Sequence, residues 1–210
     1  MKITVIGAGN MGSAFVSQLA RAGHQVSVTA RDSGKAAQVA AANPGARAVE
    51  IAGATTGADA VILATGYADA VSALQAAGDL KGQVVIDITN PLTADYMGLT
   101  IGHSTSAAEE IAKAVPGAEV VKAFNTVFAQ VLAEGADFGD GRKVSVFVAS
   151  DSERAKQTAT AIAESIGVAV VDAGGLMNAR DLEPLAGLNI YLAYGAGQGT
   201  GIAPTWVRKA

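Results

Sequence analysis

A glycine-rich turn near the N-terminus constrains the fold more than any other part of the sequence. It follows the apolar, β-branched run Lys2–Ile6 and precedes a helical pattern that starts at Met11. Three glycines in a G-x-G-x-x-G pattern between a strand and a helix are typical of a dinucleotide-binding turn. We expect the first glycine to permit a tight turn, the second to let the backbone approach a pyrophosphate, and the third to let the helix pack on the strand. The residues of the turn are Gly7, Ala8, Gly9, Asn10, Met11 and Gly12.

Short β-branched runs alternate with Ala-rich helical segments along the rest of the chain. We predict strands at Lys2–Ile6, Gln25–Thr29, Ala46–Glu50, Ala60–Ala64, Gln83–Ile88, Glu119–Phe124, Val144–Ala149 and Val168–Asp172. We predict helices at Met11–Ala22, Gly34–Ala42, Ala68–Ala77, Ala107–Val115, Glu153–Ile166 and Leu182–Tyr194. This alternation predicts an α/β fold: a Rossmann-like, doubly wound, mostly parallel sheet followed by a short C-terminal helical segment. We expect residues 1–175 to form the nucleotide-binding domain with a sheet extension, and residues 176–210 to form a C-terminal helix and tail.

Polar residues mark the starts of three predicted helices. Ser106 and Glu109 have the spacing of a capping box before the fourth helix. Asp151 and Ser152 can cap the fifth helix. Asp181 is the expected N-cap of the last helix, which places Pro184 in its first turn. That helix carries an apolar stripe, which predicts packing in the core or between two copies of the chain. The stripe consists of Leu182, Leu185, Leu188, Tyr191 and Leu192.

The end of the second strand indicates which dinucleotide is bound. An NAD site would place Asp or Glu there to accept a hydrogen bond from the ribose 2′-hydroxyl, whereas this chain has Ala30 followed by Arg31. A guanidinium can hold a 2′-phosphate, and Lys35 adds a second positive charge one helical turn later. The carboxylate of Asp32 would repel that phosphate unless it caps the following helix, which is the role we expect for it. The sequence therefore favours NADP(H) over NAD(H).

Three further loops follow strands at the edge of the sheet where a ligand crevice is expected. They supply amides, hydroxyls and one aromatic ring, which can orient a nicotinamide ring without acting as acids or bases. Tyr67 can instead pack at the start of a helix. Asn90-Pro91 is a candidate cis peptide bond. The residues assigned to the cofactor crevice are Ala64, Thr65, Gly66, Tyr67, Asn90, Pro91, Asn125 and Thr126.

Composition excludes several chemistries and partners. The chain has no Cys, which excludes thiol nucleophiles, disulfides and thiolate metal sites, and His24 and His103 are too few for a three-His metal site. We expect His24 to lie in a surface turn, and His103 to be either a substrate-facing or a solvated residue of a loop on the crevice side. A net charge of −4 argues against a nucleic-acid partner. The chain starts directly in a strand pattern and its apolar stretches are short, so we expect a cytoplasmic protein without a membrane partner.

The sequence resembles the NADPH-dependent F420 reductase family over nearly its whole length. The resemblance rests on the glycine turn, Ala30-Arg31 with Lys35, and four later segments: Asn90-Pro91-Leu92, Val121 to Val127, Asp172 to Leu176 and Glu183-Pro184-Leu185. It implies a homodimer in which hydride passes between NADP(H) and coenzyme F420 or another ring acceptor, such as a flavin. By motif position it implies that Ala8 to Met11 line the pyrophosphate, and that Ala30, Arg31 and Lys35 hold the 2′-phosphate. Tyr67 and Val71 would lie beside the cofactor, and Asn125 and Thr126 where the nicotinamide and acceptor pocket begins. No side chain is expected to act as a catalytic group, because the two rings carry the redox chemistry.

Two departures from the family pattern leave the acceptor open. Thr65-Gly66-Tyr67 stands where deazaflavin-using members commonly carry Ile-Pro-Trp-like residues, and Asn125 stands where they carry His. A flavin, a quinone, a ferric chelate or a small carbonyl therefore remains an alternative acceptor. The opening residues are equally similar to pyrroline-5-carboxylate and imine reductases, and a non-catalytic NADP(H) sensor is a further alternative.

Overall fold

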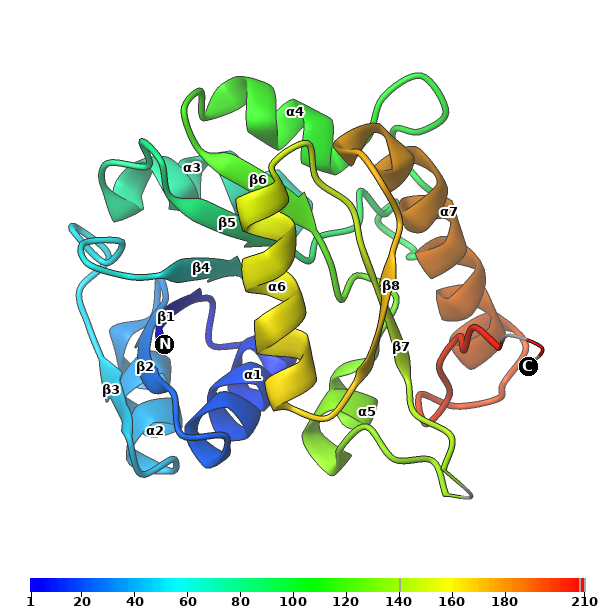
Figure 1. Cartoon of the computed structure of the whole chain (residues 1–210), viewed down its shortest axis with the longest axis horizontal. Helices are drawn as coiled ribbons and strands as arrows, with labels where there is room; N and C mark the ends of the chain where they lie inside the picture. The colour runs from blue at the N-terminus through cyan, green and yellow to red at the C-terminus, as the bar shows by residue number, and fades with distance from the viewer. Residues whose placement is uncertain (140, 208, 210) are drawn as a thin grey trace.

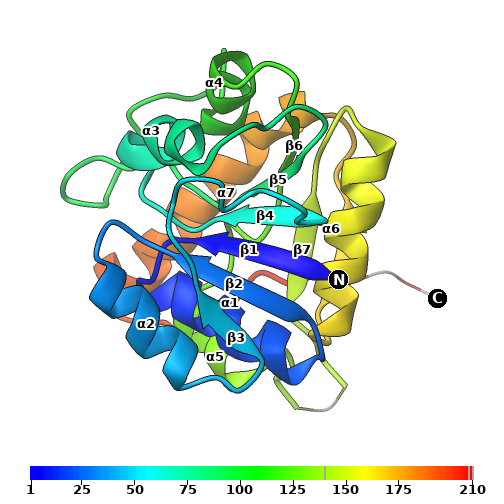
Figure 2. The same ribbon diagram turned by 90° about the vertical axis from the view of Figure 1, so that its left-hand side faces the viewer.

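A six-stranded parallel sheet runs through the centre of the molecule (Figures 1 and 2). The computed structural model describes residues 1–139, 141–207 and 209. The strand order is β3-β2-β1-β4-β5-β6, so the chain winds outward from β1 to β3 and then crosses back to start at β4. The order reverses between β1 and β4, as in doubly wound folds. The strands are β1 (Lys2–Ile6), β2 (Gln25–Thr29), β3 (Ala46–Ala48), β4 (Ala60–Leu63), β5 (Val84–Asp87) and β6 (Glu119–Lys122). The predicted Rossmann-like α/β class is confirmed.

Helices cover both faces of this sheet, which explains why its central strands β1, β4 and β5 are mostly apolar and almost entirely buried. Along β1, Ile3 and Val5 pack with α1 and α6 on one face, while Ile6 packs with α3 and α4 on the other. The helices are α1 (Asn10–Arg21), α2 (Ser33–Ala41), α3 (Tyr67–Ala77), α4 (Ala107–Ala114), α5 (Ala129–Glu134), α6 (Glu153–Ser165) and α7 (Ala179–Ile190). Turns rather than a helix join β3 to β4.

The last two strands form a separate parallel pair, β7 (Ser145–Val148) and β8 (Ala169–Asp172). This pair meets the main sheet at an antiparallel bridge, in which Lys122 and Ala149 exchange backbone hydrogen bonds of 2.9 and 3.0 Å. The predicted sheet extension therefore turns away from the main ladder. Whether residues 1–175 and 176–210 behave as separate domains stays a prediction.

The helix starts agree with the sequence except at the C-terminus. Ser106 and Ser152 cap α4 and α6, each accepting a hydrogen bond from the backbone N–H three residues later. The predicted start of the last helix at Leu182, with Asp181 as N-cap, is wrong. After a short 3-10 turn, η1 (Leu176–Asn178), α7 begins at Ala179 and contains Pro184 in its interior. The proline removes one backbone donor and its ring crowds the Arg180 carbonyl, at a cost of about 3 kcal/mol, which the packing of α7 outweighs.

Two other expectations need correction. Helix α5 was not predicted, because six residues are too few to show helical periodicity. The Asn90-Pro91 bond is not cis, since the described residues contain no cis peptide bond. Trans is the favoured isomer, and the chain after Pro91 runs on into a loop in which the Pro91 carbonyl accepts hydrogen bonds from Thr100.

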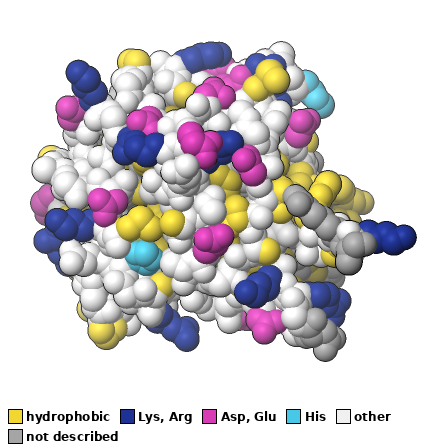
Figure 3. Space-filling model, in the orientation of Figure 1, with side chains coloured by type: hydrophobic (Ala, Val, Ile, Leu, Met, Phe, Trp, Pro, Cys, Tyr) yellow, Lys and Arg dark blue, Asp and Glu magenta, His cyan; other side chains and the backbone are white. Residues whose placement is uncertain are grey.

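The end of the chain packs beside the second sheet. After α7 comes a π-helical turn, η2 (Tyr191–Gly195), and the tail brings the Trp206 ring edge-on to Phe147, with ring centroids 5.9 Å apart. The space-filling view shows acidic and basic side chains interspersed over this face, with apolar side chains exposed beside the C-terminus (Figure 3). Within the described residues, no helix combines the length and apolar character needed to cross a bilayer.

Candidate functional site

The glycine turn at the end of β1 is fixed by two close backbone approaches. A Cβ on Gly7 would lie 2.2 Å from the Ala64 carbonyl oxygen, and Gly7 has a φ of 121°, which side-chain-bearing residues rarely adopt. A Cβ on Gly12 would lie 1.9 Å from the Gly7 carbonyl oxygen. Gly9 differs, because a Cβ there would meet no atom within 4 Å. Two glycines thus close the turn, and the third leaves open space above it.

The N-terminus of α1 opens into that space. Gly9 is the N-cap residue and has no side chain to accept from the first N–H groups of the helix. No acidic residue stands in the first turn of α1. Free N–H groups and the positive end of the helix dipole make such a terminus suited to an anion.

On one side of the turn lies a pocket of about 460 Å³, here called the Arg31 pocket. It is formed at the carboxyl ends of β1, β2 and β4, and it collects four charged side chains. Asp32 accepts a hydrogen bond of 3.1 Å from the Lys35 backbone N–H, so it caps α2 as the sequence predicted. The pocket is lined by Ile6, Gly7, Ala8, Gly9, Ala30, Arg31, Asp32, Lys35, Ile51, Thr65, Gly66, Asp69, Ser72, Ala73 and Ala76.

Sequence reasoning missed the ion pair that crosses this pocket. The Arg31 guanidinium donates to the Asp69 carboxylate from α3, with both nitrogen-to-oxygen distances at 3.3 Å. Asp69 stands in the first turn of α3, where an acidic residue is common for helix stability alone. The available signal was its position in the first turn of α3, the helix that follows β4.

On the other side of the turn lies a pocket of about 260 Å³, here called the Asn125 pocket. It is enclosed by the start of α1, the loops after β5 and β6, and α7. Most of its lining residues have apolar side chains, the exposed wall is about equally polar and apolar, and none of the lining residues is charged. The lining residues are Asn10, Met11, Ile88, Asn90, Phe124, Asn125, Thr126, Val127, Phe128, Ala129, Ala186, Asn189, Ile190 and Tyr194.

Three asparagines tie the walls of the Asn125 pocket together. The Asn90 amide donates to the Asn125 backbone carbonyl at 2.8 Å. The Asn125 amide donates to Asn90 Oδ1 at 3.0 Å and to the Leu182 carbonyl of α7 at 2.9 Å. Asn189 of α7 also donates to the Thr126 carbonyl at 3.1 Å. These bonds use the donors of Asn125 and leave its carbonyl oxygen for another partner.

Four buried polar atoms at the carboxyl ends of strands have no hydrogen-bond partner in the described structure. They are Thr65 Oγ1, Thr89 Oγ1, Asn125 Oδ1 and Thr126 Oγ1. A buried polar atom left unpaired costs about 1–3 kcal/mol, so such atoms are uncommon away from ligand sites. Three of these residues line the two pockets flanking the glycine turn. The arrangement fits a polar ligand that spans both pockets.

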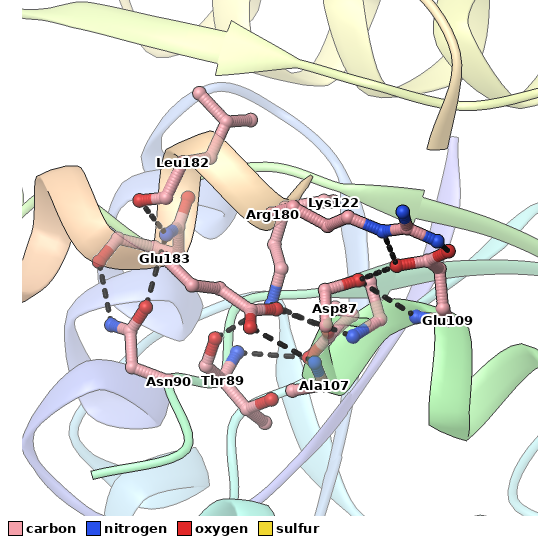
Figure 4. A network of polar contacts seen from close by, with 12 residues as sticks. Asp87, Thr89, Asn90, Ala107, Glu109, Lys122, Arg180, Leu182 and Glu183 are labelled. Carbon is pink, nitrogen blue, oxygen red and sulfur yellow. Dashed lines mark hydrogen bonds and ion pairs between the residues drawn. The ribbon is translucent and has the colours of Figure 1, made fainter. Parts of the chain in front are cut away.

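A buried ionic cluster lies beside the hydrogen bonds of Asn90 (Figure 4). Lys122 donates to Asp87 at 2.7 Å, to Glu183 of α7 at 2.8 Å and to the Thr89 carbonyl at 2.7 Å. All three charged side chains are almost completely buried. Glu183 also accepts from the backbone N–H groups of Ala107 and Ala108 at the start of α4. The cluster joins β5, β6, α4 and α7.

A second ionic contact holds α7 against α4. Arg180 donates to both carboxylate oxygens of Glu109, at 2.9 and 2.6 Å. Glu109 also accepts from the Ser106 hydroxyl, in place of the return bond expected for a capping box. The hydrogen bond from Arg180 is the main reason why the pKa of the Glu109 carboxyl lies below its ordinary value, and the bond from Ser106 adds to this effect. Burial opposes both by raising the pKa.

Some residues assigned from the sequence lie outside the two pockets. Tyr67 and Val71 pack against the apolar cluster beneath α3 and α4 and line neither pocket. The pKa of the Tyr67 phenol is raised, mainly by burial and to a smaller extent by the negative charge of Glu110. His103 is exposed, with a φ of 60°, and also lines neither pocket. His24 contacts the N-terminal amine at 3.2 Å and Ser165 at 2.8 Å, in the turn before β2.

A larger hollow of about 650 Å³ lies elsewhere, over the early parts of β1 and β2, beside β3 and the loop that follows it. Its lining contains none of the sequence-assigned site residues. The hollow is open because turns, and not a helix, connect β3 to β4. Size alone does not make it the functional site, since the unpaired polar atoms lie elsewhere.

Comparison with known proteins finds one family whose members match nearly the whole chain. Residues 2–91 match the family model for NADP oxidoreductases dependent on coenzyme F420. The F420-dependent NADP reductase of Methanothermobacter thermautotrophicus is 32% identical over 216 residues, which cover 91% of this chain and 89% of that protein. The rat metalloreductase STEAP3 is 32% identical over 114 residues, but these are only 22% of its length.

A solved structure extends the match over the whole fold. The crystal structure of a provisional F420-dependent NADP reductase from Arthrobacter sp. FB24 has a TM-score of 0.87 and 31% identity. The alignment covers 99% of this chain and 100% of that one. Because the similarity to the Methanothermobacter reductase extends over most of both chains, this chain belongs to the family of NADP oxidoreductases dependent on coenzyme F420.

Proposed function

We propose that the protein binds NADP(H) along the carboxyl edge of the sheet and transfers hydride between it and a ring-type acceptor such as coenzyme F420 or a flavin. One observation carries the proposal: two pockets flank a single anion-suited helix terminus, one containing two cationic side chains, Arg31 and Lys35, and the other two of the unpaired buried polar atoms. A dinucleotide has a matching order of groups, with a phosphorylated adenosine, a central pyrophosphate and a polar ring.

The pyrophosphate is assigned to the glycine turn. Gly7 and Gly12 keep the turn closed, and Gly9 leaves room for the ligand beside the free N–H groups of α1. Ala8, Asn10 and Met11 line the pockets on the two sides of this point.

The 2′-phosphate is assigned to the Arg31 pocket. Arg31 and Lys35 supply positive charge, and Ala30 allows the adenosine to approach the end of β2. Thr65 and Gly66 form the opposite wall, while Ala64 supports the turn from below.

The nicotinamide is assigned to the Asn125 pocket. Asn125 Oδ1 and Thr126 Oγ1 can hydrogen-bond its carboxamide, because neither has a partner within the described chain. Asn90 holds Asn125 in place, and the adjacent Pro91 is buried. Tyr67 and Val71 belong to α3 and line neither pocket, so the proposal assigns them no contact with the cofactor.

The chemistry of the Asn125 pocket is positioning. When bound, the nicotinamide supplies or accepts the hydride. The apolar residues Met11, Ile88 and Ile190 limit the access of water, and the amides fix the orientation of the ring. No lining residue carries a carboxylate, imidazole or amine, and Tyr194 contributes the one phenol.

The activity is tested by mixing the protein with NADPH and one acceptor at a time, and following the loss of nicotinamide absorbance. The panel contains coenzyme F420, FMN, a quinone and ferric citrate. Oxidation of NADPH by a ring acceptor supports the proposal. Tight NADPH binding without turnover by any acceptor would favour the NADP(H) sensor instead.

We also propose that the protein acts in the cytoplasm as a homodimer, without a nucleic-acid partner. Large apolar side chains are exposed on α7 and just after it, at Leu188, Tyr191 and Tyr194, and these could meet in a second copy. Light scattering of the purified protein, with Tyr191→Asp as the interface variant, tests the dimer. A monomeric wild type would rule it out.

A further inference from the structure

The Arg31 pocket is balanced in charge before any ligand enters. Arg31 and Lys35 contribute two positive charges, and Asp32 and Asp69 contribute two negative ones. The carboxylate of Asp32 is engaged with the N-terminus of α2, through the Lys35 N–H. Asp69 is the carboxylate that faces the guanidinium.

The geometry of the Arg31–Asp69 pair resembles that of a guanidinium with a phosphate. Two nitrogens of Arg31 meet two oxygens of Asp69, each at 3.3 Å. A bidentate phosphate would use the same two nitrogens. The Arg31 side chain is 87% exposed and that of Asp69 is 45% exposed, so little packing fixes either group. The Arg31 guanidinium can therefore turn from the Asp69 carboxylate to a phosphate, and this movement breaks the Arg31–Asp69 ion pair.

We infer that Asp69 is a specificity-determining residue that lowers the preference of this pocket for NADP(H) over NAD(H). This inference rests on the proposed function. Asp69 competes with the 2′-phosphate for Arg31, and its charge repels the phosphate after the pair has opened. An unphosphorylated ribose carries no charge there, so its binding does not require Arg31 to leave Asp69. Ser72 also lines the pocket, but its neutral hydroxyl can only form hydrogen bonds and cannot repel a phosphate as the Asp69 carboxylate does.

A purely structural role for Asp69 makes a different prediction. Asp69 is the third residue of α3, where a carboxylate stabilises the helix through its dipole. Loss of that effect would lower the stability of the protein, but it would alter the binding of both dinucleotides alike. The ratio of the two affinities therefore separates the roles.

The test is calorimetric titration of NADPH and NADH into the wild type, Asp69→Asn and Arg31→Ala. Glu153→Gln is the matched control, because it removes a carboxylate from the first turn of α6, which contributes no residue to the Arg31 pocket. For Asp69→Asn we expect the Kd of NADPH to fall about three- to fivefold, while that of NADH changes less than about twofold. The control should change neither. The NADPH affinity of Asp69→Asn should also fall more steeply with salt, because the pocket then carries a net positive charge.

The possible failures are distinguishable. A wild type that binds no NADPH overturns the proposed function together with this inference. If Arg31→Ala loses NADPH affinity while Asp69→Asn binds NADPH no better than the wild type, only the role of Asp69 is overturned. Asp69→Ser provides the same comparison if Asp69→Asn does not fold, since serine also lacks the charge.

Discussion

The buried lysine Lys122 is predicted to be the most stability-critical charged residue of the ionic cluster. Lys122→Met keeps most of the side-chain volume but removes the ammonium group. The change leaves Asp87 and Glu183 facing each other in the interior, both almost completely buried, and leaves the Thr89 carbonyl without its 2.7 Å donor. Removing one partner of a buried ion pair costs about 3–5 kcal/mol. We expect a loss of that size, a large part of the roughly 5–15 kcal/mol by which a domain is stable.

The assay is urea unfolding of both proteins, followed by circular dichroism. The expected result is a lower midpoint at an unchanged slope, because the surface exposed on unfolding is nearly the same. Lys113→Met is the matched control: Lys113 is 67% exposed and pairs with Glu110 at 2.9 Å on the surface of α4. Its loss should cost less than about 1 kcal/mol.

A third protein separates lost charge balance from lost packing. Lys122→Met combined with Asp87→Asn and Glu183→Gln removes all three charges while keeping similar shapes. We expect it to be more stable than Lys122→Met alone, because the unpaired carboxylates are gone. A Lys122→Met midpoint equal to that of Lys113→Met would refute the reasoning, and so would a triple variant less stable than the single one.

Three further predictions concern the turn, the helix contact and the pocket. Gly9→Ala should fold normally, because its Cβ meets no protein atom, but it should weaken NADPH binding, because the Cβ enters the space left for the ligand. Gly12→Ala should weaken NADPH binding and also unfold at lower urea, because its Cβ would lie 1.9 Å from the Gly7 carbonyl oxygen. Titration with NADPH and urea unfolding of both variants measure the two effects. Glu109 has a depressed pKa in the fold, so its contact with Arg180 contributes stability above the unfolded value of 4.5, and this contribution is lost as pH falls through the lower folded value. Arg180→Met should flatten that acid-side loss of stability in unfolding curves taken across this range, and an unchanged slope would contradict the assignment. Asn125→Leu should raise the Kd of NADPH about tenfold or more through the lost carboxamide partner, and calorimetry that finds equal affinity would remove the nicotinamide from this pocket.

Local patterns predicted the parts of the fold that depend on local physics. The glycine turn was predictable because close approach and a positive φ leave no alternative to glycine at Gly7 and Gly12. The role of Asp32 as a cap followed from its place directly before a helix, and the structure agrees. The start of α7 was predicted too late, because we expected Pro184 to lie in the first turn of the helix. In the structure the packing of α7 stabilises the helix with Pro184 in its interior.

The ionic cluster shows why the rest of the site was not predictable in the same way. Asp87 and Lys122 pair across 35 residues of sequence, and Glu183 reaches the α4 N-terminus across 76. A single charge at the end of an apolar strand resembles the polar boundary of that strand, so neither Asp87 nor Lys122 looked unusual alone. Once β5 and β6 are known to be adjacent in register, Asp87 and Lys122 face each other, and burial then requires them to pair. The same logic applies to Asp69: its role depends on α3 and the end of β2 lying at one edge of the sheet, which is a property of topology rather than of any local pattern.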